Sequence, residues 1–168
     1  MNSQKNIKMM MKLAMVTALY VAISLLVMPL SFGAIQFRLA EMFNLLIIFD
    51  KRYMYAVTLG CAITNFFSPL GIVDVVIGAT STFIALWISW KGLTLFNHQW
   101  QKLLWIDGVV TLSTISVALE LHVISHLPLL MTYVTVMLGE ALSLGVGTVL
   151  ILIMAHHFPK MYHRFYLE

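Results

Sequence analysis

Charge is scarce in this chain. Only 10% of its 168 residues are Asp, Glu, Lys or Arg and 61% are hydrophobic, whereas soluble domains use about 45–50% apolar residues. Together with a mean hydropathy of +0.92, this composition excludes a soluble protein and predicts an all-α integral membrane protein. A helix needs about 20 mostly apolar residues to cross the bilayer, so the length allows about six crossings or part-crossings and no soluble domain.

The sequence also lacks the motifs of several functional classes. Its single cysteine, Cys61, lies in an apolar stretch, so it offers neither a disulfide framework nor a metal site. No Gly-rich phosphate-binding loop and no Ser/His/Asp or Cys/His set is placed for catalysis. The cations flank hydrophobic segments without forming a basic surface, which argues against nucleic-acid binding. We therefore expect no cofactor, and any active transport would take its energy from elsewhere.

Charges, Pro, Gly and Asn mark the ends of the apolar segments. They predict six helices, at residues 9–29, 39–49, 53–64, 71–90, 102–125 and 129–157, in a single transmembrane domain. The first segment has the basic flank of a signal peptide, but its apolar run is long and similar segments follow, which favours a retained helix. The second and third are too short to span alone, so we expect them to cross obliquely or to pack between longer neighbours.

The cations indicate an orientation. When the helices are threaded in order, nine of the ten Lys and Arg residues fall on the side of the N-terminus: Lys5, Lys8, Lys12, Lys51, Arg52, Lys91, Lys102, Lys160 and Arg164. The positive-inside rule assigns that side to the cytoplasm, which predicts a multi-pass protein of the cell membrane with both termini inside. All four Trp residues fall near the same face, as an interfacial belt would. The exception is Arg38, on the outer side and three residues before Glu41.

Four acids lie in the outer half of this threading. Glu41 and Asp74 are near outer helix ends, and helix geometry puts Glu120 roughly 9 Å and Glu140 roughly 17 Å below the outer surface. An ionisable group inside the membrane costs about 2.5–3.5 kcal/mol unless it faces a cavity or a partner. We therefore expect a shared polar cavity, open to the outside. One cation, Arg38, cannot pair with four acids, so the surplus suggests protonation or a ligand that is cationic or rich in hydrogen-bond donors.

Some of these residues have simpler readings. Arg38 and Glu41, at i and i+3, could form an ion pair that holds helices together, and Asp74 could stabilise a helix N-terminus. His122 and His126 are one helical turn apart, but this is a weak metal signal, and we expect no metal site. On the first helix, the stripe of Ala14, Ala18 and Ala22 indicates close packing, within the bundle or against another membrane subunit.

Longer stretches carry a family resemblance. QFRLAEMFNLL at residues 36–46 and LGCAITNFFSPLGIVDVVIGATSTFIA at residues 59–85 resemble the queuosine-precursor transporter (QueT) family, with support from VALELHV around Glu120 and MLGEALSLGVG around Glu140. Proteins of that family are substrate-binding S components of energy-coupling factor (ECF) transporters. The resemblance implies a six-helix S component that captures its substrate from outside. It would then dock, through Ala14, Ala18 and Ala22, on a transmembrane scaffold (T) subunit driven by two cytoplasmic ATPases.

The implied substrates are deazaguanine precursors of queuosine, such as preQ1 (the aminomethyl compound) or queuine. A carboxylate, Glu140 or Glu120, could accept N1–H and the 2-amino group as a bidentate pair. Asp74 or Glu41 would bind the ammonium, Asn65 the carbonyl, and Arg38 would hold a carboxylate in place. Phe66, Phe67 or Tyr133 could stack on the ring. The predicted substrate-binding set is Arg38, Glu41, Asn44, Asn65, Ser68, Asp74, Glu120 and Glu140.

Two other functions stay open at this point. One is a stand-alone ion-coupled transporter in which Glu140 or Glu120 carries a proton. The other is a membrane-embedded enzyme, which the lack of a nucleophile and base pair disfavours. Dependence on ATPase partners would separate the S component from the first, and a turned-over product would identify the second.

Overall fold

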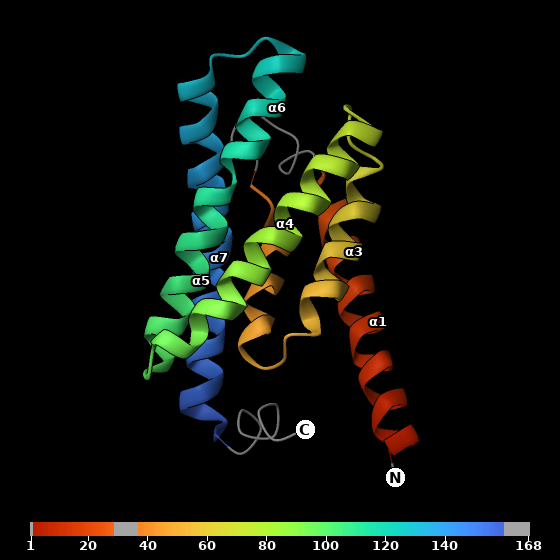
Figure 1. Cartoon of the computed structure of the whole chain (residues 1–168), viewed down its shortest axis with the longest axis vertical. Coiled ribbons are helices and arrows are strands. Elements are labelled where there is room, and N and C mark those ends of the chain that lie inside the picture. Colours follow the sequence, from red (N-terminus) through yellow and green to blue (C-terminus); the bar gives the residue numbers. More distant parts are fainter. Residues whose placement is uncertain (1, 29–36, 160–168) are drawn as a thin grey trace.

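The computed structural model describes residues 2–28 and 37–159, and within them every regular element is helical (Figure 1). In chain order the elements are α1 (Asn2–Leu26), the 3₁₀ helix η1 (Leu39–Ile48), α3 (Tyr53–Asn65), α4 (Ile72–Gly92), the short 3₁₀ helix η2 (Leu93–Leu95), α5 (Gln99–Ser113), α6 (Ile115–Ser125) and α7 (Leu129–His157). The start of α1 and the end of α7 lie at the same end of the bundle.

Four segments are long and apolar enough to cross a membrane: Gln4–Leu26, Ile72–Leu95, Gln99–Ser125 and Leu129–His157. Their outer surfaces are apolar, as side chains facing lipid must be; Leu26, for example, is 82% exposed and Leu130 is 75% exposed. Exposed apolar side chains on this scale are incompatible with a water-soluble monomer. The chain is therefore a helical membrane protein.

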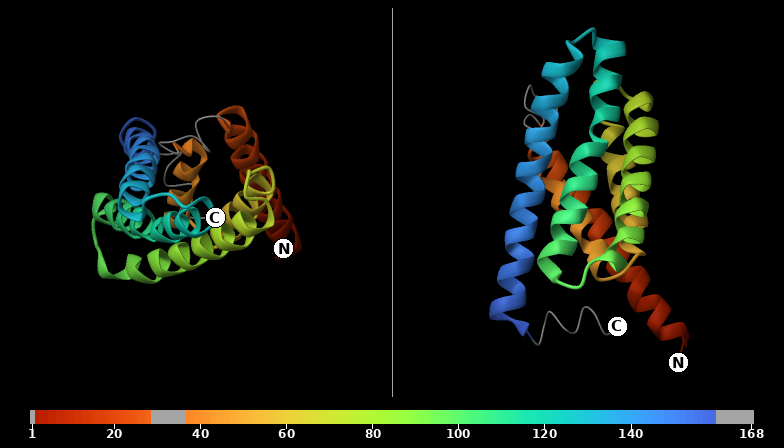
Figure 2. Two further views of the ribbon diagram at one scale, coloured as in Figure 1. Left: turned by 90° about the horizontal axis from the view of Figure 1, so that it is seen from above. Right: turned by 60° about the vertical axis from the view of Figure 1, so that its left-hand side comes forward.

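The short elements η1 and α3 lie among the long helices. Viewed from above, η1 lies between α1 and α7 (Figure 2), and it contacts both of them. Its ten residues have no charged side chain except Glu41, so it can be buried at membrane depth where protein surrounds it. At the turn into α3, Arg52 donates to both carboxylate oxygens of Asp50, with distances of 2.6–3.1 Å.

The helix boundaries differ most from the sequence-based ones at the first and fifth predicted helices; at the other four they agree to within two residues, although the predicted helix 39–49 is a 3₁₀ helix. The first helix begins at Asn2, before the predicted residue 9, because its exposed polar turns can be solvated beyond the apolar segment; residue 29 lies outside the described residues. The predicted helix 102–125 begins at Gln99, where the Gln101 side chain accepts from the His98 backbone amide at 3.3 Å. This satisfies an amide that the first turn would otherwise leave without a partner.

The same helix is broken at Thr114 into α5 and α6. Ser113 and Thr114 donate their hydroxyls to the carbonyls of Val110 and Thr111, at 2.7 and 2.6 Å. Such side-chain bonds compete with the helical backbone ladder and bend helices. The sequence-based prediction of one continuous helix was therefore wrong at this point.

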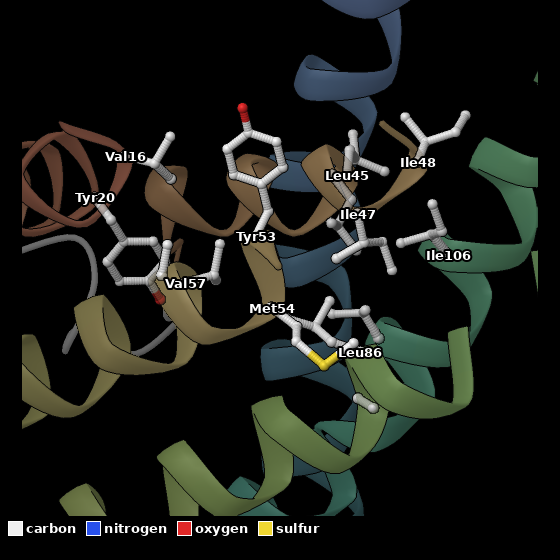
Figure 3. Close-up of a cluster of buried hydrophobic side chains, with 14 of the residues drawn as sticks. Val16, Tyr20, Leu45, Ile47, Ile48, Tyr53, Met54, Val57, Leu86 and Ile106 are labelled. Atoms are coloured by element: carbon white, nitrogen blue, oxygen red, sulfur yellow. The ribbon is translucent and has the colours of Figure 1, made fainter. Parts of the chain in front are cut away.

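Apolar side chains from several elements fill the core (Figure 3). Leu45 of η1, Leu86 of α4, Ile106 of α5 and Leu144 of α7 each have an exposed fraction of 0%. Gly147 of α7 lets this helix approach η1, because a Cβ atom there would lie 2.8 Å from Leu45 Cδ1 and from Met42 Cβ. Close approach of α7 thus fixes the position of η1.

Replacing Gly147 by Ala should lower the free energy of unfolding by about 1–3 kcal/mol, because the added methyl group overpacks the contact between α7 and η1. Gly145→Ala is the matched control, since a Cβ atom at Gly145 meets nothing within 4 Å. Thermal unfolding of both variants in detergent tests this. Equal stability of the two variants would show that the contact between α7 and η1 tolerates an added methyl group at residue 147.

Candidate functional site

Two adjoining cavities lie between η1, α4, α5, α6 and α7. The smaller, called here the small compartment, has a volume of about 30 Å³, and its polar walls include Arg38, Glu41, Asn44 and Glu140. The larger, called the large compartment, has a volume of about 210 Å³, and its walls are Arg38, Ser68, Pro69, Leu70, Asp74, Val117, Glu120, Leu121 and Ser125. Arg38 and Val117 line both, so the two compartments meet there.

The structure brings together seven of the eight residues that the sequence selected. Arg38, Glu41, Asn44 and Glu140 line the small compartment, and Ser68, Asp74 and Glu120 join Arg38 at the large one. These residues come from four different helical elements and from two connections. Their part in substrate binding stays a prediction, but their convergence on one space is a property of the fold.

Asn65 lies outside both cavities. It is 3% exposed, and its Nδ2 donates to the backbone carbonyl of Asp74 at 3.0 Å. Gly78 on α4 leaves room for it, since a Cβ atom there would collide with Asn65 Nδ2. The amide nitrogen of Asn65 is thus engaged within the protein, and the expected contact between Asn65 and a ligand carbonyl stays a prediction. Asn65 holds α3 against α4 and positions Asp74.

Asp74 lies in the first turn of α4, which follows a sharp backbone turn. Gly71, the residue before α4, has a φ of +59°, a conformation that favours glycine. This turn starts the helix beside the large compartment, and the partial positive charge of a helix N-terminus stabilises an acid there. Helix stabilisation and a role at the cavity are thus compatible for Asp74, which is 2% exposed.

Each carboxylate oxygen of Glu41 accepts a hydrogen bond from the protein. The hydroxyl of Tyr20 donates to its Oε1 at 2.7 Å, and Nδ2 of Asn44 donates to its Oε2 at 2.6 Å. Side chains three residues apart eclipse on a 3₁₀ helix, so η1 places Glu41 and Asn44 one above the other. Tyr20 was missed by the sequence analysis, because one Tyr in an apolar helix has no spacing signal that links it to an acid 21 residues later.

Other acceptors in the walls have no such donors. Within the described residues, these buried oxygens have no hydrogen-bond partner: Oδ1 of Asn44, Oδ1 of Asp74, both carboxylate oxygens of Glu120 and Oε1 of Glu140. A buried polar group left without a partner costs about 1–3 kcal/mol. The cavity walls therefore present acceptors that a ligand with several donors, or with a positive charge, would satisfy.

The predicted stacking residues and the two histidines lie elsewhere. Phe66 and Phe67 are 68% and 52% exposed and pack on each other, and neither they nor Tyr133 line a compartment. His122 contacts the carbonyl of Leu127 through Nδ1 at 2.6 Å, and His126 forms the left-handed turn after α6. In residues 2–28 and 37–159, no cluster of His, Cys, Asp or Glu is suited to a metal ion.

The alanine stripe faces away from the bundle. Ala14, Ala18 and Ala22 are exposed on α1, whereas Val16 and Tyr20 of the same helix are buried against the rest of the chain. The helix lies at the edge of the bundle (Figure 1), packed on α3 and η1. Packing within the described part of this chain therefore does not account for the stripe.

Comparisons with known proteins agree on one family. The model of a family described as QueT transporter matches residues 10–156. The protein described as queuosine precursor transporter QueT from Lactococcus lactis subsp. cremoris is 37% identical over 144 residues, which cover 80% of this chain and 85% of that protein. No solved structure gives a significant match.

Removing an unsatisfied acid should stabilise the ligand-free protein. Glu120→Leu eliminates two buried oxygens without partners and should raise the free energy of unfolding by about 1–3 kcal/mol. Glu41→Leu is the matched comparison: it leaves the donors of Tyr20 and Asn44 unpaired and should lower stability by a similar amount. Thermal unfolding at neutral pH measures both changes. Destabilisation by both substitutions alike would contradict the contrast between the two acids.

Proposed function

The chain belongs to the QueT transporter family, and we propose that it is the substrate-capture S component of an ECF transporter that imports a deazaguanine precursor of queuosine. The family and the relative are transporters, so the chain is a transporter and not an enzyme. The observation that carries the substrate class is the set of buried wall oxygens without partners. A deazaguanine supplies the donors that those oxygens need.

The sizes of the compartments suit the two parts of the aminomethyl compound. The large compartment, at about 210 Å³, has the apolar side chains of Leu70, Val117 and Leu121 in its walls and accommodates the flat ring. The small compartment, at about 30 Å³, has space for little more than a water molecule or two, since each needs roughly 10–15 Å³. A short arm that ends in an ammonium group fits such a space.

The wall oxygens without partners suggest which residue binds which group of the ligand. Glu120 is the one wall carboxylate with both oxygens buried and unpartnered, so it accepts N1–H and the 2-amino group as a bidentate pair. Glu140 Oε1 and Asn44 Oδ1 accept from the ammonium in the small compartment, and Asp74 Oδ1 accepts a remaining ring N–H. Arg38, which lines both compartments, offsets the negative charge of the acids. Glu41 acts indirectly, because its oxygens are already engaged.

The remaining features suit a subunit that depends on partners. The exposed stripe of Ala14, Ala18 and Ala22 offers the close approach that helix packing in membranes uses, and a transmembrane scaffold (T) subunit with two ATPases would supply it with a partner and with energy. The shared end of α1 and α7 and the distribution of the cations favour the cell membrane with both termini in the cytoplasm.

Purified protein should bind the aminomethyl deazaguanine more tightly than the cyano deazaguanine, guanine or a panel of vitamins, which do not combine the deazaguanine ring with an ammonium arm. It should also bind it more tightly than queuine, because the amine of queuine carries a further ring that is too large for the small compartment, at about 30 Å³. Calorimetric titration of the full chain measures this. Glu120→Gln and Glu140→Gln should each weaken binding by about tenfold or more, since hydrogen bonds to charged groups contribute about 1.5–3 kcal/mol.

Asp107→Asn is the matched control for these two variants. Asp107 accepts a hydrogen bond from Thr148 at 2.9 Å and lines neither compartment. The affinity of the Asp107→Asn variant for the ligand should therefore equal that of the wild type. Binding of a vitamin alone would refute the substrate class. Unchanged affinity in Glu140→Gln would remove that residue from the site.

If the alanine stripe of α1 docks on the scaffold subunit, a substitution there should stop transport without weakening substrate binding. Ala18→Leu should abolish uptake by cells that contain the scaffold and ATPases while substrate affinity stays unchanged, because the larger side chain blocks close helix approach. Met15→Leu, an exposed change beside the stripe, is the control and should transport normally. Uptake that needs a proton gradient but no ATPase partner would instead identify an ion-coupled transporter.

A further inference from the structure

Tyr20 links the first helix to the wall of the small compartment. Its side chain is 3% exposed, and its hydroxyl donates to Glu41 Oε1 at 2.7 Å. The ring fits against α3 because Gly60 has no side chain; a Cβ atom there would lie 2.9 Å from the ring. Phe43 adds a tilted ring contact, with a centroid distance of 6.4 Å. Packing on two sides thus fixes the position of the hydroxyl.

Glu41 in turn determines how the Asn44 amide is turned. A carboxylate offers only acceptors, so the amide must direct its NH₂ group to Glu41 Oε2, at 2.6 Å. The amide oxygen then lies on the opposite side. Asn44 has an exposed fraction of 0%, its Oδ1 has no hydrogen-bond partner within the described residues, and the residue lines the small compartment. The compartment therefore presents an acceptor at Asn44.

We propose that Tyr20 is a positioning residue that sets the ligand specificity of the small compartment, by holding Glu41 and through it the acceptor orientation of Asn44. This rests on the proposed function, because the ligand group read by Asn44 is the ammonium of an aminomethyl arm. Without the hydroxyl, Glu41 Oε1 loses its donor and the carboxylate turns to recover one. The Asn44 amide is then no longer held, and its NH₂ group can face the compartment.

The orientation of the Asn44 amide distinguishes between ligands whose side arms end in different groups. An ammonium has three donors and no acceptor, so it needs the oxygen of Asn44, whereas a nitrile nitrogen is an acceptor and is disfavoured by that oxygen. Ligands that share the deazaguanine ring and differ in this arm therefore report the orientation of one amide. A general loosening of the fold would weaken both ligands alike.

The test measures the affinity of the full-length protein for the aminomethyl and the cyano deazaguanine in Tyr20→Phe. The ratio of the two affinities should shift about tenfold towards the nitrile, as the loss of one hydrogen bond to a charged group allows, with the nitrile affinity unchanged or raised. Tyr55→Phe is the matched control, because Tyr55 is 59% exposed and packs on Phe83; its ratio should equal that of the wild type.

Asn44→Leu removes the selecting oxygen itself and should shift the ratio in the same direction, which keeps the test usable if Tyr20→Phe is poorly stable. An unchanged ratio in Tyr20→Phe, an equal weakening of both ligands, or a shift that Asn44→Leu does not reproduce would overturn the inference. Wild-type protein that binds neither ligand would instead refute the proposed substrate class, and this inference with it.

Discussion

Acids buried in an apolar bundle must be compensated, and the rest of this structure depends on how that is done. Glu41 is compensated from within, by one hydroxyl and one amide. The buried oxygens of Glu120, together with one each of Asp74 and Glu140, are left without partners in the described part of the chain. In a medium without water such groups are expensive, and the proposed function takes them as the place where a ligand supplies the missing donors.

Several local features of the backbone bring these acids to the two adjoining cavities. The 3₁₀ geometry of η1 stacks Glu41 on Asn44, and the close approach allowed at Gly147 presses α7, which carries Glu140, against that element. The break at Thr114 separates α6, which carries Glu120, from α5. Because α1 carries both the exposed alanines and Tyr20, the proposed docking helix is hydrogen-bonded to Glu41 in the wall of the small compartment. A displacement of α1 on docking would therefore reach Glu41 directly.

The sequence revealed the acids because a charge inside an apolar segment stands out, and helix geometry was enough to put Glu41, Asp74, Glu120 and Glu140 in the same half of the membrane. It could not distinguish their roles, because Glu41 and Glu120 differ only in the donors around them. The sequence also carried no sign that Asn65 binds the backbone carbonyl of Asp74, because a contact between two helices leaves no pattern in the residues around it. The break at Thr114 was missed because hydroxyl bonds to the preceding turn leave the apolar pattern of the helix unchanged.

The most direct measurement is an experimental structure of the protein with the aminomethyl deazaguanine bound. The account predicts that the ring occupies the large compartment with its N1–H and 2-amino edge on Glu120. The ammonium should lie in the small compartment, within hydrogen-bond distance of Glu140 and of the amide oxygen of Asn44. A ligand bound outside these compartments, or one whose ammonium contacts Glu41 while Glu140 and Glu120 remain unpaired, would contradict it.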